Sequence, residues 1–494
     1  MAPAMVTKKR TKPEHPTTFR VVAGWSLIAV ALMFAVLAGW IRYHFGSVTF
    51  EQIVNNLPGG GGGEVGNPTL ATEGLIVVIA IPAALVLVIA VAVSRLKGHL
   101  VTRRRVRWVP TVSVLTALTV LLTVAGVPQF AIAQLGGQTI GPYYVKPQIT
   151  SAPTKPLNLI TIYLESTENT LSDPAVMGQN LLANLDSATK GWADDRGVSV
   201  FEGGGWTMAG VVGTQCGIPL KNKLFNGSYS LNDFGETVNH YLPNATCLGD
   251  VLATQGYTSV FIGGAENNFA GKDTYFLDHG YGTFYGLDQW KEAGEKASAL
   301  SEWGLSDTRL VDHAIDTVDR LHRGDKPFNL TMLTLDTHEP AAVYPSCHTD
   351  DAVAMATAFK CSTKAVARFL NHLKQAGYLD DTVVMVMGDH LKGTGDHDDY
   401  RNVLPQVSGR TVVFRVHSPN PVSFTRPEVD QLSVLPTTLE LLGFGIPEGR
   451  AGVGVSFVGE HDLSGTVLDL PKEDYQKLLQ APSTGLYREF WETP

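Results

Sequence analysis

The chain has 494 residues, a formal net charge of −9 and only 17% charged residues. Domains average roughly 150 residues, so we expect two or three structural units. The negative charge argues against a nucleic-acid-binding protein. The charged fraction is lower than the roughly 25% of soluble domains, which predicts a membrane portion.

Three apolar runs occupy much of the first 135 residues, at residues 19–41, 75–96 and 109–133. A transmembrane helix needs about 20 apolar residues, and each run meets that length. None of the runs contains an acidic residue. We therefore expect three transmembrane helices in an integral membrane protein. The first run could instead be a cleaved signal peptide, but its length and the lack of a small-residue cleavage site favour a span.

Basic residues predict the orientation of these helices. They gather in the tail, residues 1–18, and in the loop after the second run: Lys8, Lys9, Arg10, Lys12, Lys97, Arg103, Arg104, Arg105 and Arg107. The loop between the first two runs holds the spacer Gly59–Gly63 and has no Lys or Arg after Arg42. By the positive-inside rule the tail is cytoplasmic, and three crossings place the rest of the chain outside. Residues 134–156, rich in Gly and Pro, are expected to form an extended linker.

From residue 157 onward, apolar runs alternate with amphipathic stretches. The apolar runs predict strands at residues 157–165, 258–264, 328–340, 382–390 and 410–416. Helical candidates lie between them, at residues 174–193, 248–255, 307–322, 352–375 and 429–442. Such alternation predicts an α/β domain with a mostly parallel central sheet, here an extracytoplasmic domain of residues 157–494.

Polar side chains of the metal-binding kind end three of these strands. They are Glu165, His338, and Asp389 with His390. Because the carboxyl ends of parallel strands share one edge of the sheet, we expect these residues to converge. Carboxylate and imidazole ligands suit Zn²⁺ or Mn²⁺. The acidic residues that follow, Asp396, Asp398 and Asp399, are expected to form a solvated rim.

A candidate nucleophile lies in EGGGWTMAGVVGTQCGIPL, residues 202–220. Its Gly-rich turn leads into a helix that we expect to begin near Thr207. A hydroxyl at a helix N-terminus lies where free N–H groups favour negative charge, and a nearby metal ion could turn it into a nucleophile. A structural alternative is that Thr207 only caps the helix. Thr214, two turns later, is a competing nucleophile.

Several motifs, in this order along the chain, resemble the alkaline phosphatase/sulfatase superfamily. More narrowly, they are similar to lipoteichoic acid synthases and to phosphoglycerol transferases that act on periplasmic glucans. The resemblance covers residues 155–445. The motifs are YLES (163–166), GWTMAG…TQCGIPL (205–220), CLGDVLATQGYTSVFIGG (247–264), FAGKDTYF (269–276), LDTHEP (335–340), MGDH (387–390) and DQLSVLPTTLELLG (430–443).

The resemblance implies a sulfatase-like fold and one divalent ion, Mn²⁺ with Mg²⁺ or Zn²⁺ as alternatives. Its ligands would be Glu165, Thr207, Asp389 and His390. Thr207 would be the nucleophile and would form a phosphoglyceryl-threonine intermediate.

Three further residues gain roles from the resemblance. Lys272, in FAGKD, would bind the donor phosphate. His338 would act as general acid/base or bind the phosphate. His397 would help to bind the phosphoglycerol group.

The implied reaction moves sn-glycerol phosphate from phosphatidylglycerol to an envelope polysaccharide or polymer and releases diacylglycerol. The enzyme would be a multi-pass phosphotransferase of the bacterial inner membrane. Phosphoethanolamine transfer and a membrane-anchored sulfatase or phosphodiesterase are alternatives, although the C/S-x-P-x-R core of sulfatases is absent. A catalytically inactive envelope-binding protein is disfavoured because all four ligand candidates are present.

The segment before Lys272 separates the two kinds of transferase. In lipoteichoic acid synthases a His and a Trp precede the basic residue. The segment GGAENNFAGK lacks both, which favours the glucan-type transferases and leaves the acceptor open.

The chain has four cysteines, Cys216, Cys247, Cys347 and Cys361, and no C-x-x-C pair, so a cysteine zinc site is not expected. In an oxidising compartment they would form two disulfides. Three connectivities are possible. The short separation favours Cys347–Cys361, which leaves Cys216–Cys247.

Overall fold

The computed structural model describes residues 18–45, 50, 72–95, 108–135, 137–221, 235, 238–347, 349, 351–395 and 398–492. The chain divides into one unit of residues 1–49 and 64–128 and a second of residues 50–63 and 129–494. Several predicted features lie outside the described residues: the basic tail 1–17, the spacer Gly59–Gly63, the basic loop 96–107 and His397.

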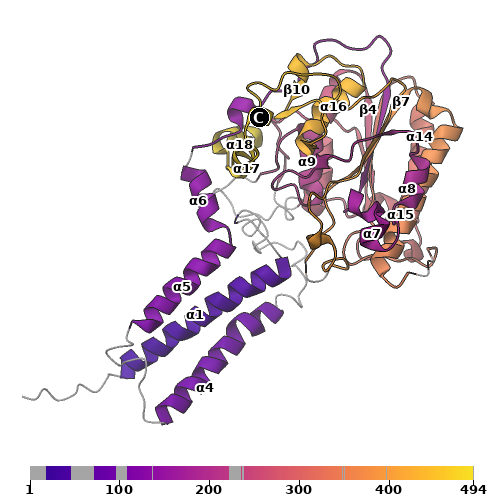
Figure 1. Ribbon diagram of the computed structural model, residues 1–494. Coiled ribbons are helices and arrows are strands. Elements are labelled where there is room, and N and C mark those ends of the chain that lie inside the picture. The colour runs from indigo at the N-terminus through magenta and orange to yellow at the C-terminus, as the bar shows by residue number, and fades with distance from the viewer. Residues whose placement is uncertain are drawn as a thin grey trace, which may run out of the picture. The chain divides into compact units, whose positions relative to one another are not determined.

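The first unit consists of apolar helices (Figure 1). Helix α1 (Thr18–Phe45) contacts both α4 (Ile81–Arg95) and α5 (Val109–Val124). A π-helical segment, Leu75–Ala80, leads directly into α4. Two stretches, Val21–Tyr43 and Thr72–Val93, are long and apolar enough to cross a membrane, and only 11% and 17% of their residues are buried. Most of their apolar side chains are thus left for another apolar medium to cover.

The third predicted span, residues 109–133, is not one continuous helix. Helix α5 ends at Val124, and α6 (Val127–Leu135) begins after Gly126, whose φ of +70° cannot continue a right-handed helix. Helix α5 is therefore a shorter apolar helix than the two candidate spans.

The second unit is built on a seven-stranded sheet in the order β2-β8-β7-β1-β6-β4-β5. Its strands are β1 (Asn158–Leu164), β2 (Ala193–Asp194), β4 (Thr258–Gly263), β5 (Thr283–Tyr285), β6 (Phe328–Leu333), β7 (Thr382–Gly388) and β8 (Phe414–His417). The five strands from β7 to β5 run parallel, whereas β8 is antiparallel to β7 and β2 to β8. The expected mostly parallel sheet is confirmed. Short pairs form beside it: β3 (Val198–Ser199) with β9 (Val429–Asp430), and β10 (Arg450–Ala451) with β11 (Gly454–Val455).

Both faces of the sheet are covered, which explains why the central strands read as continuous apolar runs. Alternate residues of β1 belong to different cores: Leu159 and Tyr163 pack on one face, Ile160 and Ile162 on the other. Helices α14 (Asp307–His322) and α15 (Ala354–Gln375) cover the second face (Figure 1), and α14 buries one stripe of side chains at helical spacing.

The other helices of this unit are shorter. The predicted helix 174–193 divides into α7 (Pro174–Met177) and α8 (Ala183–Ala188), and Gly178, with φ of +74°, ends the first. The remaining helices that the structure describes in this unit are α9 (Thr207–Cys216), α11 (Leu248–Thr254), α12 (Lys272–Asp278), α13 (Leu287–Glu292), α16 (Val434–Leu441), α17 (Lys472–Gln480) and α18 (Thr484–Trp491).

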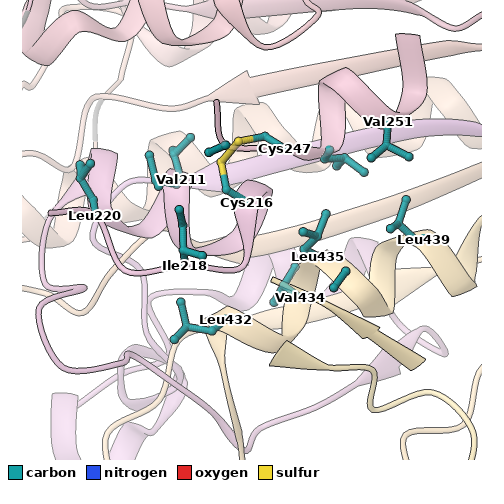
Figure 2. Packing of buried hydrophobic residues seen from close by; sticks show 14 of the residues in the cluster. Val211, Cys216, Ile218, Leu220, Cys247, Val251, Leu432, Val434, Leu435 and Leu439 are labelled. Carbon is teal, nitrogen blue, oxygen red and sulfur yellow. A yellow bond between two sulfur atoms is a disulfide. The ribbon is translucent and has the colours of Figure 1, made fainter. Parts of the chain in front are cut away.

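A disulfide joins the end of α9 to the start of α11 within the first core. Figure 2 shows Cys216 bonded to Cys247, with Val211 of α9 and Val251 of α11 on either side and Leu435 and Leu439 of α16 nearby. A second disulfide joins Cys347 to Cys361 of α15. These are the two pairs expected from the sequence.

The predicted linker is packed on the second unit. The Val145 N–H donates to the Gly452 carbonyl at 2.7 Å, and the Thr150 N–H to the Gly445 carbonyl at 2.8 Å. This compact unit thus includes residues before the expected boundary at 157.

Candidate active site

Two neighbouring strands place the first two ligand-type residues side by side. Strand β1 pairs with β7 so that Leu164 lies opposite Gly388, and Glu165 and Asp389 come next. A Cβ atom on Gly388 would lie 1.9 Å from the Thr167 carbonyl oxygen, so only glycine permits this approach. Both carboxylates are buried.

Backbone amides fix the orientation of the Asp389 carboxylate. Its Oδ1 accepts from the N–H groups of Ser166 and His390, each at 2.8 Å. Ser166 has a left-handed φ of +54°, a strained conformation for a residue with a side chain. Its hydroxyl donates to Glu165 Oε1 at 2.7 Å, so this residue contacts both carboxylates.

His390 completes a three-residue cluster. Its Nδ1 lies 2.8 Å from the Leu391 carbonyl, which can only accept, so Nδ1 carries the hydrogen. Its Nε2 lies 3.4 Å from Glu165 Oε1 and 3.5 Å from Asp389 Oδ2. One ligand atom from each of the three residues lies within 4.8 Å of the others.

The donor set of this cluster fits a divalent ion. Among the described residues Asp389 Oδ2 is buried and has no hydrogen-bond partner, a costly state that a cation would relieve. Two carboxylates and an imidazole nitrogen are ligands that Zn²⁺ and Mn²⁺ accept.

The charges of the cluster favour bound positive charge. Burial, and then the charge of Glu165, raise the pKa of Asp389 to about 8. Burial lowers the pKa of His390, but the two carboxylates outweigh it and raise that pKa to about 9. Burial alone would raise the pKa of Glu165, yet His390 and His338 hold it below its usual range. The site therefore retains a cation, either as a proton or as a metal ion.

Thr207 is the first residue of α9 and faces this cluster. Trp206 before it is extended, with φ of −155°, and the Gly210 N–H bonds back to the Trp206 carbonyl at 3.0 Å. The first N–H groups of the helix have no partner within it and favour negative charge in front of them. The Thr207 hydroxyl donates to Glu165 Oε2 at 3.2 Å.

Thr214 occupies a different environment. It is buried in α9, its hydroxyl lies 2.6 Å from the Tyr163 hydroxyl, and it donates to the Gly210 carbonyl at 2.7 Å. The structure thus brings Thr207 to the carboxylates and uses Thr214 within the helix packing.

The loop after β6 binds the backbone of Glu165 through two threonine hydroxyls. The Glu165 N–H donates to the Thr334 hydroxyl at 2.9 Å, and the Thr337 hydroxyl donates to the Glu165 carbonyl at 2.6 Å. Sequence reasoning missed both threonines, although hydroxyls at and beyond a strand end were a usable signal. His338 follows; its Nδ1 lies 2.9 Å from the Glu339 carbonyl and its ring centroid 4.1 Å from that of Trp303.

Lys272 contributes a buried positive charge near Glu165. It is the first residue of α12, and its Nζ lies 5.9 Å from the centroid of the Phe269 ring. Burial lowers the pKa of Lys272 to about 8, against the opposing effect of Glu165. His397, the remaining substrate-binding candidate, lies outside the described residues.

Two residues, Gln431 and Gly210, contact the backbone carbonyl of Asp389. Gln431 donates its Nε2 to this oxygen at 2.6 Å. Helix α9 approaches it so closely that a Cβ atom on Gly210 would lie 2.0 Å away. Sequence reasoning did not single out either residue, because both contacts join segments far apart in the chain.

Two buried carboxylates, Asp336 and Asp307, join the loop that carries His338 to the start of α14. Asp336 Oδ2 accepts from the Asp307 N–H at 3.1 Å, while Asp307 accepts from the N–H groups of Leu335 and Asp336 at 2.7 and 3.3 Å. Burial, outweighing bonds to Ser362 and the backbone, raises the pKa of Asp307 to about 6. Burial and the charge of Asp307 raise the pKa of Asp336 well above its usual range.

A second group of metal-type residues, Cys247, Asp250 and His279, has a structural role. Cys247 is in a disulfide and offers no thiolate. The His279 Nδ1 and Nε2 are hydrogen-bonded to Asp250 and to the Tyr241 carbonyl, at 2.8 and 2.9 Å.

Gly210→Ala should separate α9 from the segment that carries Asp389 and His390. The added methyl cannot share space with the Asp389 carbonyl. We expect stability to fall by about 1–3 kcal/mol and divalent-ion affinity by about 10-fold or more, measured by thermal denaturation and by calorimetric titration with Mn²⁺. The matched control is Gly485→Ala in α18, where a Cβ atom meets nothing within 4 Å. Equal ion affinity in the two variants would contradict the close approach.

Asp336→Asn should reduce the pH dependence of folding stability. The pKa values of Asp307 and Asp336 are both raised in the folded state, so the protonated pair stabilises the fold. This stabilisation is complete below about pH 4 and is lost as the pH rises through about 6 and above. The wild-type free energy of unfolding should therefore decline, as the pH rises from about 4 through about 6 and above, by on the order of 1–3 kcal/mol more than that of the variant. Denaturant unfolding at several pH values, with metal chelated, measures the difference. Parallel pH curves for the two chains would show that the pair does not titrate in this range.

Comparisons with known proteins agree with this fold. The sulfatase family profile matches residues 202–444. Phosphoglycerol transferase I of Xanthomonas campestris pv. campestris is 34% identical over 268 residues, 53% of this chain and 37% of that protein. The Salmonella arizonae protein of the same name is 34% identical over 256 residues, 50% of this chain and 32% of that protein. The chain thus matches about a third of the length of these relatives.

A solved structure supports the same fold. An alkaline phosphatase superfamily protein from Vibrio parahaemolyticus superposes with a TM-score of 0.50 and 18% identity, over 74% of this chain and 97% of that one. Together with the parallel sheet and the site at its carboxyl edge, these matches identify the domain that carries the site as a member of the sulfatase family.

Proposed function

We propose that this chain transfers glycerol phosphate from phosphatidylglycerol to a glycan or polymer of the bacterial cell envelope. The observation that carries the proposal is the Thr207 hydroxyl at the N-terminus of α9, 3.2 Å from Glu165 Oε2 in a cluster suited to a divalent ion. The 34% identity to proteins named phosphoglycerol transferase I supports the group transferred.

One divalent ion, Mn²⁺ or else Mg²⁺ or Zn²⁺, would supply Lewis acidity to the donor phosphate and ease the loss of the threonine proton. Its ligands would be the carboxylates of Glu165 and Asp389, His390 Nε2 and the Thr207 oxygen. The buried, unpartnered Asp389 Oδ2 supports this assignment.

In the first step Thr207 Oγ attacks the phosphorus of the donor. The bond from phosphorus to the diacylglycerol oxygen breaks, and that oxygen takes up a proton, so diacylglycerol leaves and glycerol phosphate stays on the threonine. The α9 N-terminus and Lys272 stabilise the negative charge that develops on the phosphoryl oxygens.

In the second step a hydroxyl of the acceptor attacks the same phosphorus and displaces Thr207. His338 would take the acceptor proton through its Nε2; the contact of its Nδ1 with the Glu339 carbonyl supports this role. His397 stays a predicted phosphoglycerol ligand.

The same proposal includes a membrane topology. Disulfides form on the extracytoplasmic side, and the second unit contains two. A cytoplasmic N-terminus then requires an odd number of crossings, so α5 with α6 would supply the third beside the two longer spans. The protein would be multi-pass, with its site facing away from the cytoplasm.

Thr207→Ala should abolish transfer, with kcat reduced on the order of 10⁴-fold or more, because it removes the hydroxyl that would attack phosphorus. The full-length protein is incubated with phosphatidylglycerol labelled in its terminal glycerol and with Mn²⁺. Diacylglycerol release is followed, and the labelled peptide is identified by mass spectrometry.

Thr214→Val is the matched control, because it removes the competing hydroxyl within the same helix. It should retain the label on Thr207. Label on Thr214, or full turnover by Thr207→Ala, would overturn the assignment. An amine-containing product from phosphatidylethanolamine, with no diacylglycerol from phosphatidylglycerol, would instead indicate phosphoethanolamine transfer.

The topology predicts that protease added to intact bacterial spheroplasts digests the second unit and spares a tag before Met1. Immunoblots for an N-terminal tag and for a C-terminal tag measure the two fragments. Digestion of both tags only after the membrane is permeabilised would place the site in the cytoplasm.

A further inference from the structure

Lys392 is a buried lysine close to the active site, two residues after His390. Its side chain is only 1% exposed. Lysine is almost never fully buried unless it is paired, because desolvation of an ammonium group is costly. The contacts of this residue therefore indicate what its burial achieves.

The ammonium group binds the loop that carries His338. Lys392 Nζ lies 2.8 Å from Glu339 Oε1 and 3.6 Å from Asp398 Oδ1. Glu339 directly follows His338, and its carbonyl lies 2.9 Å from His338 Nδ1. The same Glu339 Oε1 accepts from the Asp399 N–H at 3.1 Å. One carboxylate thus joins the His338 loop to both ends of the segment after β7.

The backbone of Lys392 is bound to the segment that follows Glu165. Its N–H donates to Glu168 Oε2 at 3.1 Å. Arg410 donates to the Lys392 carbonyl at 2.5 Å and to Glu168 Oε1 at 2.9 Å. Glu168 is fully buried, so these bonds form in a medium where they are strong.

We propose that Lys392 is a positioning residue that sets the His338 loop relative to the metal-ligand cluster. It lies on the segment that carries Asp389 and His390, and it contacts the two segments that carry Glu165 and His338. It touches none of the reacting groups itself. The proposal rests on the proposed function only where turnover is measured, since the three contacts are independent of the substrate.

The physical consequence concerns the placement of His338. Without the ammonium group the Glu339 carboxylate loses its buried partner and turns to solvent, because its side chain is already 20% exposed. A displacement of about 1 Å in a catalytic group can cost about 100-fold in rate. Binding of the donor, which uses the metal cluster and Lys272, should change little.

The first test compares Lys392→Met with wild type in the full-length protein. We expect kcat for diacylglycerol release to fall about 10- to 100-fold with KM within about 3-fold. Hydrogen exchange measured by mass spectrometry should become faster in residues 337–345 and stay the same in α14. The matched control, Lys360→Met, removes the ion pair with Asp351 at 2.7 Å and should leave both readouts at wild-type values.

Two further variants separate positioning from loss of folding. Lys392→Arg keeps the charge and should recover most of kcat. Glu339→Gln removes the charge of the partner carboxylate, and as a single variant it should lower kcat. Because it breaks the same ion pair, adding it to Lys392→Met should lower kcat no further. A fully additive double variant would overturn the proposal.

Hydrogen exchange distinguishes failure of the positioning role of Lys392 from failure of the proposed function. Unchanged exchange of residues 337–345 in Lys392→Met overturns the positioning role, whatever the turnover. Faster exchange there, in a protein whose wild type releases no diacylglycerol, would leave the positioning role standing and reject the proposed function.

Discussion

The structure around the site depends on one constraint: two carboxylates, Glu165 and Asp389, are buried next to each other. Parallel pairing of β1 with β7 places them there, and the close approach at Gly388 brings the backbone within contact of Thr167. Two adjacent negative charges in a water-poor interior repel each other and have lost their hydration. The surroundings must offset both costs for the domain to fold.

Part of the offset comes from groups that cannot move far, beside the charge of His390. Backbone N–H groups of Ser166 and His390 bind one oxygen of Asp389, and Thr334 and Thr337 hold the backbone of Glu165. Fixed dipoles of this kind stabilise charge without reorganisation. The proposed catalysis would therefore depend on the same contacts as stability, and the second oxygen of Asp389, buried without a hydrogen-bond partner, would be free to bind a cation.

Much of this could be predicted from the sequence, because the reasoning used local rules. Parallel strands share a carboxyl edge, so Glu165, His338 and Asp389 could be grouped from strand ends alone. Thr207 followed from a Gly-rich turn before a helix. The third apolar run looked continuous because its interruption depends on the left-handed conformation of Gly126, which composition does not reveal.

Long-range contacts were beyond this kind of reasoning. The expected solvated rim holds for Asp399, which is exposed and accepts from the Met355 N–H at 3.2 Å, but it is wrong for Asp398, which lies 3.6 Å from the buried Lys392 ammonium group; Asp396 lies outside the described residues. The sequence of an acidic loop does not show whether its carboxylates face water or a buried lysine. The Asp307–Asp336 pair was hidden for the same reason, since its two members come from different elements.

The charge balance of the site also explains why a divalent ion, and not a second lysine, suits it. In the proposed reaction a phosphodiester donor would bring one negative charge to Glu165 and Asp389, and the attacking threonine would develop another. Against these the chain provides His390 and Lys272, whose pKa burial lowers to about 8, so its charge is only partly retained in alkaline conditions. A further lysine would face the same desolvation. The oxygens of Glu165 and Asp389 would replace part of the hydration shell of a divalent ion, which would supply two positive charges where a buried lysine would hold less than one.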